Sequence, residues 1–304
     1  MATFKGAGKK NNIIPHGRIL YGHDGTDAYP AYVGVDGGLR VSDLGLDVAR
    51  GLVSGMATIN KFGRNTEIDS GATADIWSGG KTVGALPGGT SLIWLAPTAA
   101  CKHNIASTSG SDDGDPAGVG ARTIRIYGLP DWDTAEVNED IVMNGESNVL
   151  TQNTYVIIHR MKVLTSGATS INVGTITATA SAPSNVTVTA RIEVGIGQTE
   201  MAIYGVPSVE KLYLSLWYAS SLRSVTAAAG ANLSMLVNTN PQTQTVNFIT
   251  KETKGLITAG SSGFSRSYKE RKTIPGPAII KIQAVSGAND MDVSAGFDGI
   301  LVDN

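Results

Sequence analysis

The four histidines are the residues whose spacing can be tested most directly for metal or catalytic chemistry. No two of them have the spacing of a two-histidine metal motif, and none lies beside a nucleophile motif. His159 occurs in a strand-like run, where it shares one face with Tyr155, Ile157, Met161 and Val163. We therefore expect a buried histidine in the core or at an interface there. As a group, His16, His23, His103 and His159 predict neither a metal centre nor an active site.

Two loops rich in carboxylates offer oxygen ligands for a hard cation. They are Asp131-Trp132-Asp133 with Glu136, and Asp112-Asp113-Gly114-Asp115. Neither has the ligand spacing of a calcium loop, and aspartates in glycine-rich loops are usually solvated turn residues. Cys101 is alone, which excludes an internal disulfide and a cysteine-rich zinc site. The sequence predicts no metal, no cofactor and no catalytic residue, although a carboxylate pair for sugar hydrolysis stays open because such pairs meet through space.

The most basic stretch, residues 251 to 272, is the segment best suited to nucleic acid. Phe264 and Tyr268 are interleaved with its cations, but Glu252 and Glu270 dilute the charge, and the whole chain has a net charge of -2. The glycine-rich turns lack the Lys-Ser/Thr ending of a phosphate-binding loop. We therefore expect a solvated face or a contact with an acidic subunit, and no nucleic acid.

Alternation of apolar and polar residues predicts the elements that carry these groups. In residues 185–194 every second residue is apolar, and residues 211–219 repeat the pattern with Tyr213 and Trp217 on the opposite face, which indicates that both faces are covered. One short helix is expected within residues 43–54. The predicted fold class is all-β: an antiparallel β-sandwich or jelly-roll body, possibly of two modules. Further strands are expected at 123–127, 138–143, 154–164, 171–179, 233–237, 245–249, 278–285 and 292–302.

Residues 1–60 differ from the rest, because short apolar triplets there are divided by Asp-Gly turns. A segment with so few apolar residues cannot offset its own ordering entropy. We interpret it as an extended arm that lies on the body or on adjacent subunits, with Tyr21, Tyr29 and Tyr32 as anchors. A mobile tail is the alternative.

The segment after the arm contains residues that could fix the arm to the body, and we call them the lock residues. Arg64 supplies a planar fork of donors, Asp69 supplies a carboxylate, and Trp77 is a large apolar anchor. The prediction is that these residues fix the point where the arm leaves the body. The alternative is an ordinary turn with an exposed arginine.

The body is predicted to contain two β modules, residues 61–182 and 183–304. The boundary rests on Ala182-Pro183, which interrupts the strand pattern. A single sandwich with a long insertion is the alternative.

Only 16% of the residues are charged, which is low for a soluble domain. With so few charged residues on its surface, the protein is expected to bury part of that surface against neighbouring subunits. The alternative is a monomer that is solubilised by Ser, Thr and Asn. No secretory signal and no apolar run of membrane-spanning length is present, so no membrane partner is expected.

Several motifs resemble structural proteins of tailed bacteriophage particles, over roughly residues 51 to 303. They are the segment from Phe62 to Asp69, Asp75-Ile76-Trp77, the strand from Gly120 to Leu129, and the ending from Val293 to Asp298. The resemblance implies a non-enzymatic virion protein that is assembled in the host bacterial cytoplasm. A capsid decoration or cement protein is expected, forming a cyclic homo-oligomer (a trimer is favoured) and binding the major capsid protein or another virion protein through its arm.

The alternative implied by the same resemblance is a neck, tail or fibre component that binds a host receptor or carbohydrate. In that case Trp94, Trp132 or Trp217 could stack on sugars. Because shell, neck and fibre proteins share β-scaffolds, the fold alone does not decide between these roles.

Overall fold

The computed structural model describes residues 19–23, 28–33, 39–40, 44–80, 92–223, 229–243, 247–258 and 261–304. The chain divides into two compact units, residues 1–54 and 55–304. In the first unit, β1 (Ile19–His23), β2 (Ala28–Val33) and β3 (Leu39–Arg40) form a small antiparallel sheet, and helix α1 (Leu44–Ala49) follows. The helix expected within residues 43–54 is thus six residues long. Gly51, at φ 69°, takes the left-handed conformation that commonly follows a helix end.

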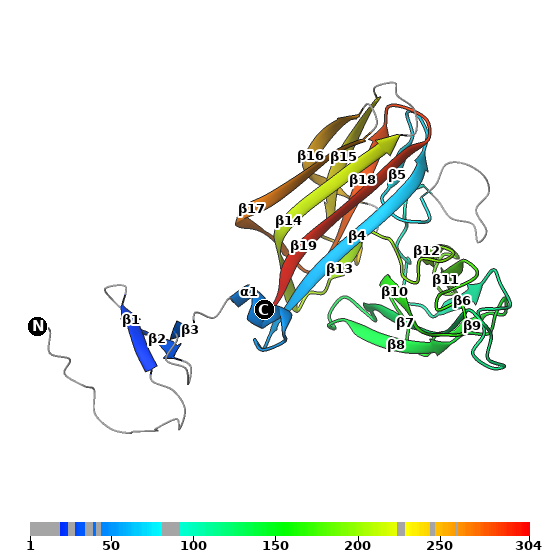
Figure 1. The fold of residues 1–304 in the computed structure, drawn as a ribbon, viewed down its shortest axis with the longest axis horizontal. Coiled ribbons are helices and arrows are strands. Elements are labelled where there is room, and N and C mark those ends of the chain that lie inside the picture. The colour runs from blue at the N-terminus through cyan, green and yellow to red at the C-terminus, as the bar shows by residue number, and fades with distance from the viewer. Residues whose placement is uncertain are drawn as a thin grey trace, which may run out of the picture. The chain divides into compact units, whose positions relative to one another are not determined.

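The second unit confirms the all-β class, because its described residues form antiparallel sheets. One sheet contains, in spatial order, β17 (Ser261–Pro275), β14 (Glu210–Arg223), β19 (Met291–Asp303) and β4 (Met56–Ile68), and Figure 1 shows these long strands side by side. No helix in the described ranges of the chain is long and apolar enough to cross a membrane.

A second sheet packs with the first to form a sandwich. It contains β18 (Ala278–Ser286), β15 (Ala229–Asn238) and β16 (Ile249–Thr258), together with the short strands β5 (Thr73–Asp75) and β13 (Ile203–Val206). The two sheets enclose one hydrophobic core, in which Trp217, Phe297 and Leu233 are fully buried. We call this body the sandwich module.

The residues between β5 and β13 build a smaller β module with its own core. Its sheets are β10-β7-β8 and β12-β11-β6-β9. The core contains Trp77, Trp94, Trp132 and Tyr155. We call this part the inserted module; its strands are β6 (His103–Ser107), β7 (Ala121–Leu129), β8 (Val137–Val142), β9 (Val149–Leu150), β10 (Ile157–Ser166), β11 (Ile176–Ala180) and β12 (Val188–Ile192).

Both ends of the inserted module meet at one point beside β18. β5 pairs with residues 283–285 of β18, and β13 pairs with residues 278–281 of the same strand. Between the residues that pair with β5 and those that pair with β13, the Ile282 amide of β18 donates to the Ala202 carbonyl. The Ala202 amide in turn donates to the Ile76 carbonyl. Trp77 and Met201 form an isolated bridge one residue further out. The insertion therefore enters and leaves the sandwich through a two-strand neck.

The modules are nested, whereas the sequence favoured consecutive ones. The boundary predicted near residues 182 and 183 falls inside the hairpin in which β11 pairs with β12. The first predicted boundary, at residue 60, falls inside β4, where Met56 to Asn60 pair with β19. The arrangement matches the alternative of a sandwich with a long insertion.

The alternation in residues 185–194 predicted that the polar residues of this strand are exposed, and this was wrong. All five residues of β12 are buried, including Thr189 and Arg191. Segments from elsewhere in the chain lie along this strand: the Trp94 indole donates to the Thr189 carbonyl and the Ser78 hydroxyl donates to the Arg191 carbonyl. Val186 and Val194, which were expected on the buried face, lie outside β12 and are exposed.

Candidate functional site: a cavity between the two β modules

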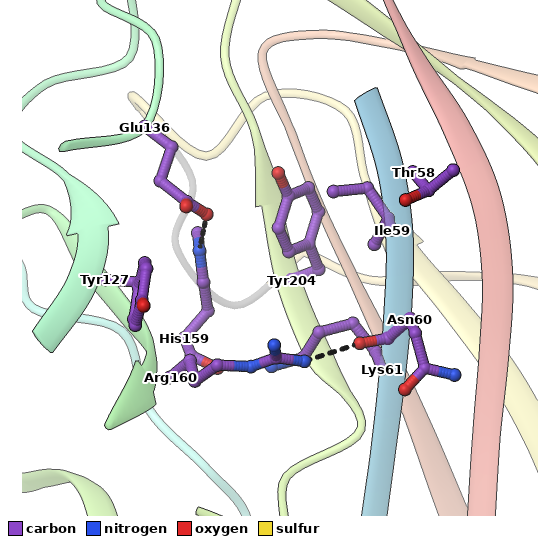
Figure 2. Close-up of a pocket in the computed structure, with 9 residues that line it drawn as sticks. All are labelled: Thr58, Ile59, Asn60, Lys61, Tyr127, Glu136, His159, Arg160 and Tyr204. Carbon is purple, nitrogen blue, oxygen red and sulfur yellow. Dashed lines mark hydrogen bonds and ion pairs between the residues drawn. The ribbon is translucent and has the colours of Figure 1, made fainter. Parts of the chain in front are cut away.

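A cavity of about 150 Å³ lies where the sandwich module meets the inserted module. β4 contributes Thr58 to Lys61, β10 contributes His159 and Arg160, and β13 contributes Tyr204. Tyr127 of β7 and Glu136, just before β8, complete the wall. Lys61 and His159 are buried while Asn60 and Glu136 are exposed, so the cavity opens to solvent on one side. We call it the junction cavity (Figure 2).

Lys61 is the buried cation of the junction cavity. It lies on the inward face of β4 with Gly63 and Asn65, and its side chain is 4% exposed. Its ammonium group donates a hydrogen bond to the carbonyl of His159, across the module boundary. Burial, together with the nearby charge of Arg160, holds the pKa of Lys61 well below its usual range, although Glu136 opposes this.

His159 and Glu136 form a pair inside the inserted module. Nε2 of His159 lies 2.5 Å from a carboxylate oxygen of Glu136, and the imidazole packs against the Tyr204 ring at a centroid distance of 4.5 Å. Burial lowers the pKa of His159 despite the nearby carboxylate. Burial opposes ionisation of Glu136, but His159, Lys61 and Arg160 together outweigh it and lower the Glu136 pKa. A neutral imidazole that donates from Nε2 to an ionised carboxylate satisfies both directions.

Arg160 makes a second link across the boundary. One guanidinium nitrogen donates to the Asn60 carbonyl at 2.7 Å, and Figure 2 shows the Arg160 and Lys61 side chains reaching from opposite modules toward the same space. Two cations and one carboxylate thus line a space that is partly closed to water. Such an arrangement can attract an anion or hold ordered water.

The tyrosine anchors lie in the first unit. Tyr21 is in β1, and Tyr29 and Tyr32 are in β2. Their side chains lie outside the described residues. The anchoring role therefore stays a prediction.

The expected lock residues are distributed around the neck of the insertion. Arg64, on β4, forms an ion pair of 2.9 Å with Asp292 on β19, and both side chains are partly exposed. Asp69 follows the end of β4, and its carbonyl accepts the Ala72 amide. Trp77 is buried in the core of the inserted module. Binding of a partner by these residues stays a prediction.

Two further residues of the same motif, Gly63 and Asn65, fasten the neck, and the sequence did not indicate the contacts that they make. The Asn65 side chain donates to the Gly80 carbonyl at 2.6 Å. A Cβ on Gly63 would overlap the Ile76 carbonyl oxygen and the Ala202 amide, so glycine is required for β4 to approach the neck this closely. The motif from Phe62 to Asp69 therefore fixes the base of the insertion. The glycine and asparagine at alternate positions of a strand were the available signal.

Asp75 and Lys281 form a second buried charged cluster on the sandwich side of the neck. Their charged groups lie 2.6 Å apart and the residues are 0% and 2% exposed. Asp75 also accepts the Trp94 amide at 2.8 Å and the Gln283 side chain at 3.0 Å. Burial raises the pKa of Asp75, and Lys281 opposes that shift. Lys281 lies over the Phe248 ring at 4.3 Å.

The candidate cation loops have other roles in the structure. Asp112 is fully buried, and its carboxylate accepts hydrogen bonds from the amides of Ala121, Val173 and Gly174 and from the Ser107 hydroxyl. In the other loop, the Asp131 carboxylate accepts the Asp133 amide and the Thr134 hydroxyl. Within the described ranges, no group of three potential ligand side chains is arranged to hold a metal ion.

The three tryptophans that were candidates for stacking on sugars, Trp94, Trp132 and Trp217, are buried, and so is Trp77. Trp132 is the most exposed of them at 8%, and it packs in the core of the inserted module. In the basic stretch, Glu252 binds Arg266 and Lys272 and accepts the Tyr268 hydroxyl, so part of its charge is neutralised on the protein itself.

No protein-family model matches this sequence, and no curated protein matches it. Among solved structures, the chain is similar to VP2 of infectious bursal disease virus. A mutant VP2 in derived T=1 particles is 12% identical over 82% of this chain and 69% of that chain, with a TM-score of 0.22. A chain of the T13 particle of the same virus is 13% identical with a TM-score of 0.21, covering 82% of this chain and 69% of that chain. At these TM-scores the likeness carries no argument, and the expected resemblance to tailed bacteriophage proteins stays a prediction.

Proposed function

We propose that this chain is a non-enzymatic structural protein of a virus particle, and more specifically a capsid decoration or cement protein. In this proposal, residues 55–304 act as a rigid block, and the N-terminal arm attaches copies to the particle and to one another. Its support is the sequence resemblance given above, the low charge content and one feature of the sandwich module.

That feature is the long open edge of the first sheet. β17 has 15 residues and is hydrogen-bonded on one side, to β14, within the described sheets. An open edge presents unpaired backbone groups to which another strand can be added. Exposed cations follow this edge at Arg266, Lys269 and Arg271. Charged side chains of this kind suppress unspecific edge pairing, and they favour a defined partner.

The alternative role, a fibre or tail component that binds carbohydrate, requires an exposed aromatic platform. The tryptophans that were candidates for it are buried in the two cores. No observation in the described residues favours this alternative over the decoration role.

Deletion of residues 1–54 tests the proposal, because this boundary keeps all of β4 in the body. The truncated protein is expected to fold, with an unchanged β-sheet circular dichroism spectrum and cooperative thermal unfolding. It is expected to be lost from particles after sedimentation. A matched control replaces residues 1–43 by a glycine-serine linker of the same length, which preserves chain length and removes the arm sequence. Normal incorporation of both variants would overturn the proposal.

A further inference from the structure

We propose that the junction cavity is a binding site for a small carboxylate anion, held between Lys61 and Arg160. The proposal concerns the cavity alone and does not depend on a role in a virus particle.

The first argument is the charge of the wall. Lys61 and Arg160 are close enough for each to disfavour the charge of the other, and Glu136 is the one carboxylate among the nine residues that line the cavity. That carboxylate is already bound to His159. A bound monoanion would offset the repulsion between the two cations and would complete the charge balance of the site.

The second argument is unused hydrogen-bonding capacity. An ammonium group has three donors and a guanidinium has five, and in the described part of the chain Lys61 and Arg160 each have one hydrogen-bond acceptor. Buried polar groups without partners are costly, so an acceptor in the cavity would stabilise this arrangement.

The third argument is size. Cavities that hold drug-sized ligands have volumes of roughly 300–1,000 Å³, whereas an engineered apolar cavity of about 150 Å³ holds benzene. The junction cavity, at about 150 Å³, therefore fits a molecule of a few heavy atoms and excludes a sugar chain. A carboxylate is planar and presents two acceptors, which suits the fork of a guanidinium.

Binding is expected to take up a proton. In the empty site, burial and Arg160 lower the pKa of Lys61, so the lysine loses its proton more readily than usual. An anion beside it stabilises the ammonium form, so the bound site holds more protons than the free one. The affinity then falls as pH rises above the pKa of Lys61 in the empty site, by about tenfold per pH unit for one linked proton.

The test is titration of the ¹⁵N-labelled protein with acetate, followed by backbone amide chemical shifts. Saturable shifts are expected at residues 59–61 and 159–160, and binding is expected to weaken as pH rises through the pKa of Lys61. Acetamide, which has nearly the same shape and no charge, is expected to cause no saturable shift at these residues.

Matched variants locate the site. Lys61→Met and Arg160→Gln are expected to weaken acetate binding by about tenfold or more. Arg64→Met removes a cation from the same strand at a side chain that is paired with Asp292, and it is expected to leave the affinity unchanged. The wild-type comparison of acetate with acetamide needs no variant, so a variant that fails to fold does not decide the test. Equal shifts with acetate and acetamide, or no saturation with acetate, would show that the cavity holds water only and would overturn the proposal.

Discussion

Two clusters of buried charge lie at the boundary between the modules, and they differ in how completely they are paired. In the neck, Lys281 contacts Asp75, whose two carboxylate oxygens also accept Trp94 and Gln283. In the junction cavity, Lys61 has a backbone carbonyl as its acceptor and open space beside it. The same residue type thus has a buried carboxylate as its partner in one place and a backbone carbonyl in the other.

This difference in pairing distinguishes a charged group that stabilises the fold from one that is available to bind a ligand. A buried ion pair that has all its hydrogen bonds fixes one geometry, and removing either partner leaves an uncompensated charge. The pKa of a buried cation without a carboxylate partner is instead lowered, so the group loses its proton more readily. The first cluster is expected to stabilise the fold, and the second is expected to respond to pH and to anions.

The largest expected effect distinguishes the two lysines. Lys281→Met should lower the free energy of unfolding by about 3–5 kcal/mol, because Asp75 is left buried without its cation. Lys61→Met should change it by less than about 1 kcal/mol or raise it, because no buried carboxylate loses its main partner. Urea unfolding of both variants measures the difference. Equal losses of stability would mean that both clusters are structural and that the comparison fails.

A second prediction concerns His103, a buried histidine in the inserted module. Burial, which a backbone interaction with Cys101 offsets only in part, lowers the pKa of His103 to about 4. The unfolded chain, with a histidine pKa of about 6.5, therefore binds a proton first as pH falls. Stability should decrease by up to about 3 kcal/mol between about pH 6.5 and about pH 4, and it should be constant for this group above that window.

The variant His103→Phe measures that contribution, because it keeps a ring in the same buried place. The wild type should become less stable relative to this variant as pH falls through the window. A constant difference in unfolding free energy over the same range would show that His103 does not titrate as the structure indicates.

The smallest effect is expected at Glu210, whose carboxyl group has a buried oxygen without a hydrogen-bond partner among the described residues. Burial, with added repulsion from Asp303 and Glu136, raises the pKa of Glu210 to about 7. The folded protein holds this proton more tightly than the unfolded chain, so stability is present at acid pH and is lost as pH rises through about 7. Because Asp303 is exposed, solvent screening limits the loss to about 1 kcal/mol.

Glu210→Gln should remove this loss, and thermal unfolding between about pH 5 and about pH 8 is the measurement. The variant should gain stability over the wild type as pH increases. Asp303→Asn, which removes the facing carboxylate and keeps the glutamate, should give part of the same gain. A gain that does not depend on pH would contradict the assignment.

The sequence predicted the strands better than the faces they bury. Period-two alternation correctly indicated strands around Val188 and Leu212, because side-chain direction alternates within one strand. It failed for Arg191, which is buried, because the covering segment around Trp94 comes from another part of the chain. For the site, alternation could flag His159 as buried, but nothing near Lys61 in the sequence marks it as buried or places Glu136 beside it.

By itself, the sequence determined the all-β class, the low surface charge and the motif from Phe62 to Asp69 as a feature with a structural purpose. The tertiary structure alone decided that the modules are nested, that this motif fastens the neck, and that Lys61 and Arg160 share a cavity. The physical reason is range. Alternation and turn chemistry act between residues a few positions apart, whereas the hydrogen bond from Lys61 to His159 joins residues 98 positions apart. Contacts of that kind exist only after the insertion has folded and its two ends have met beside β18.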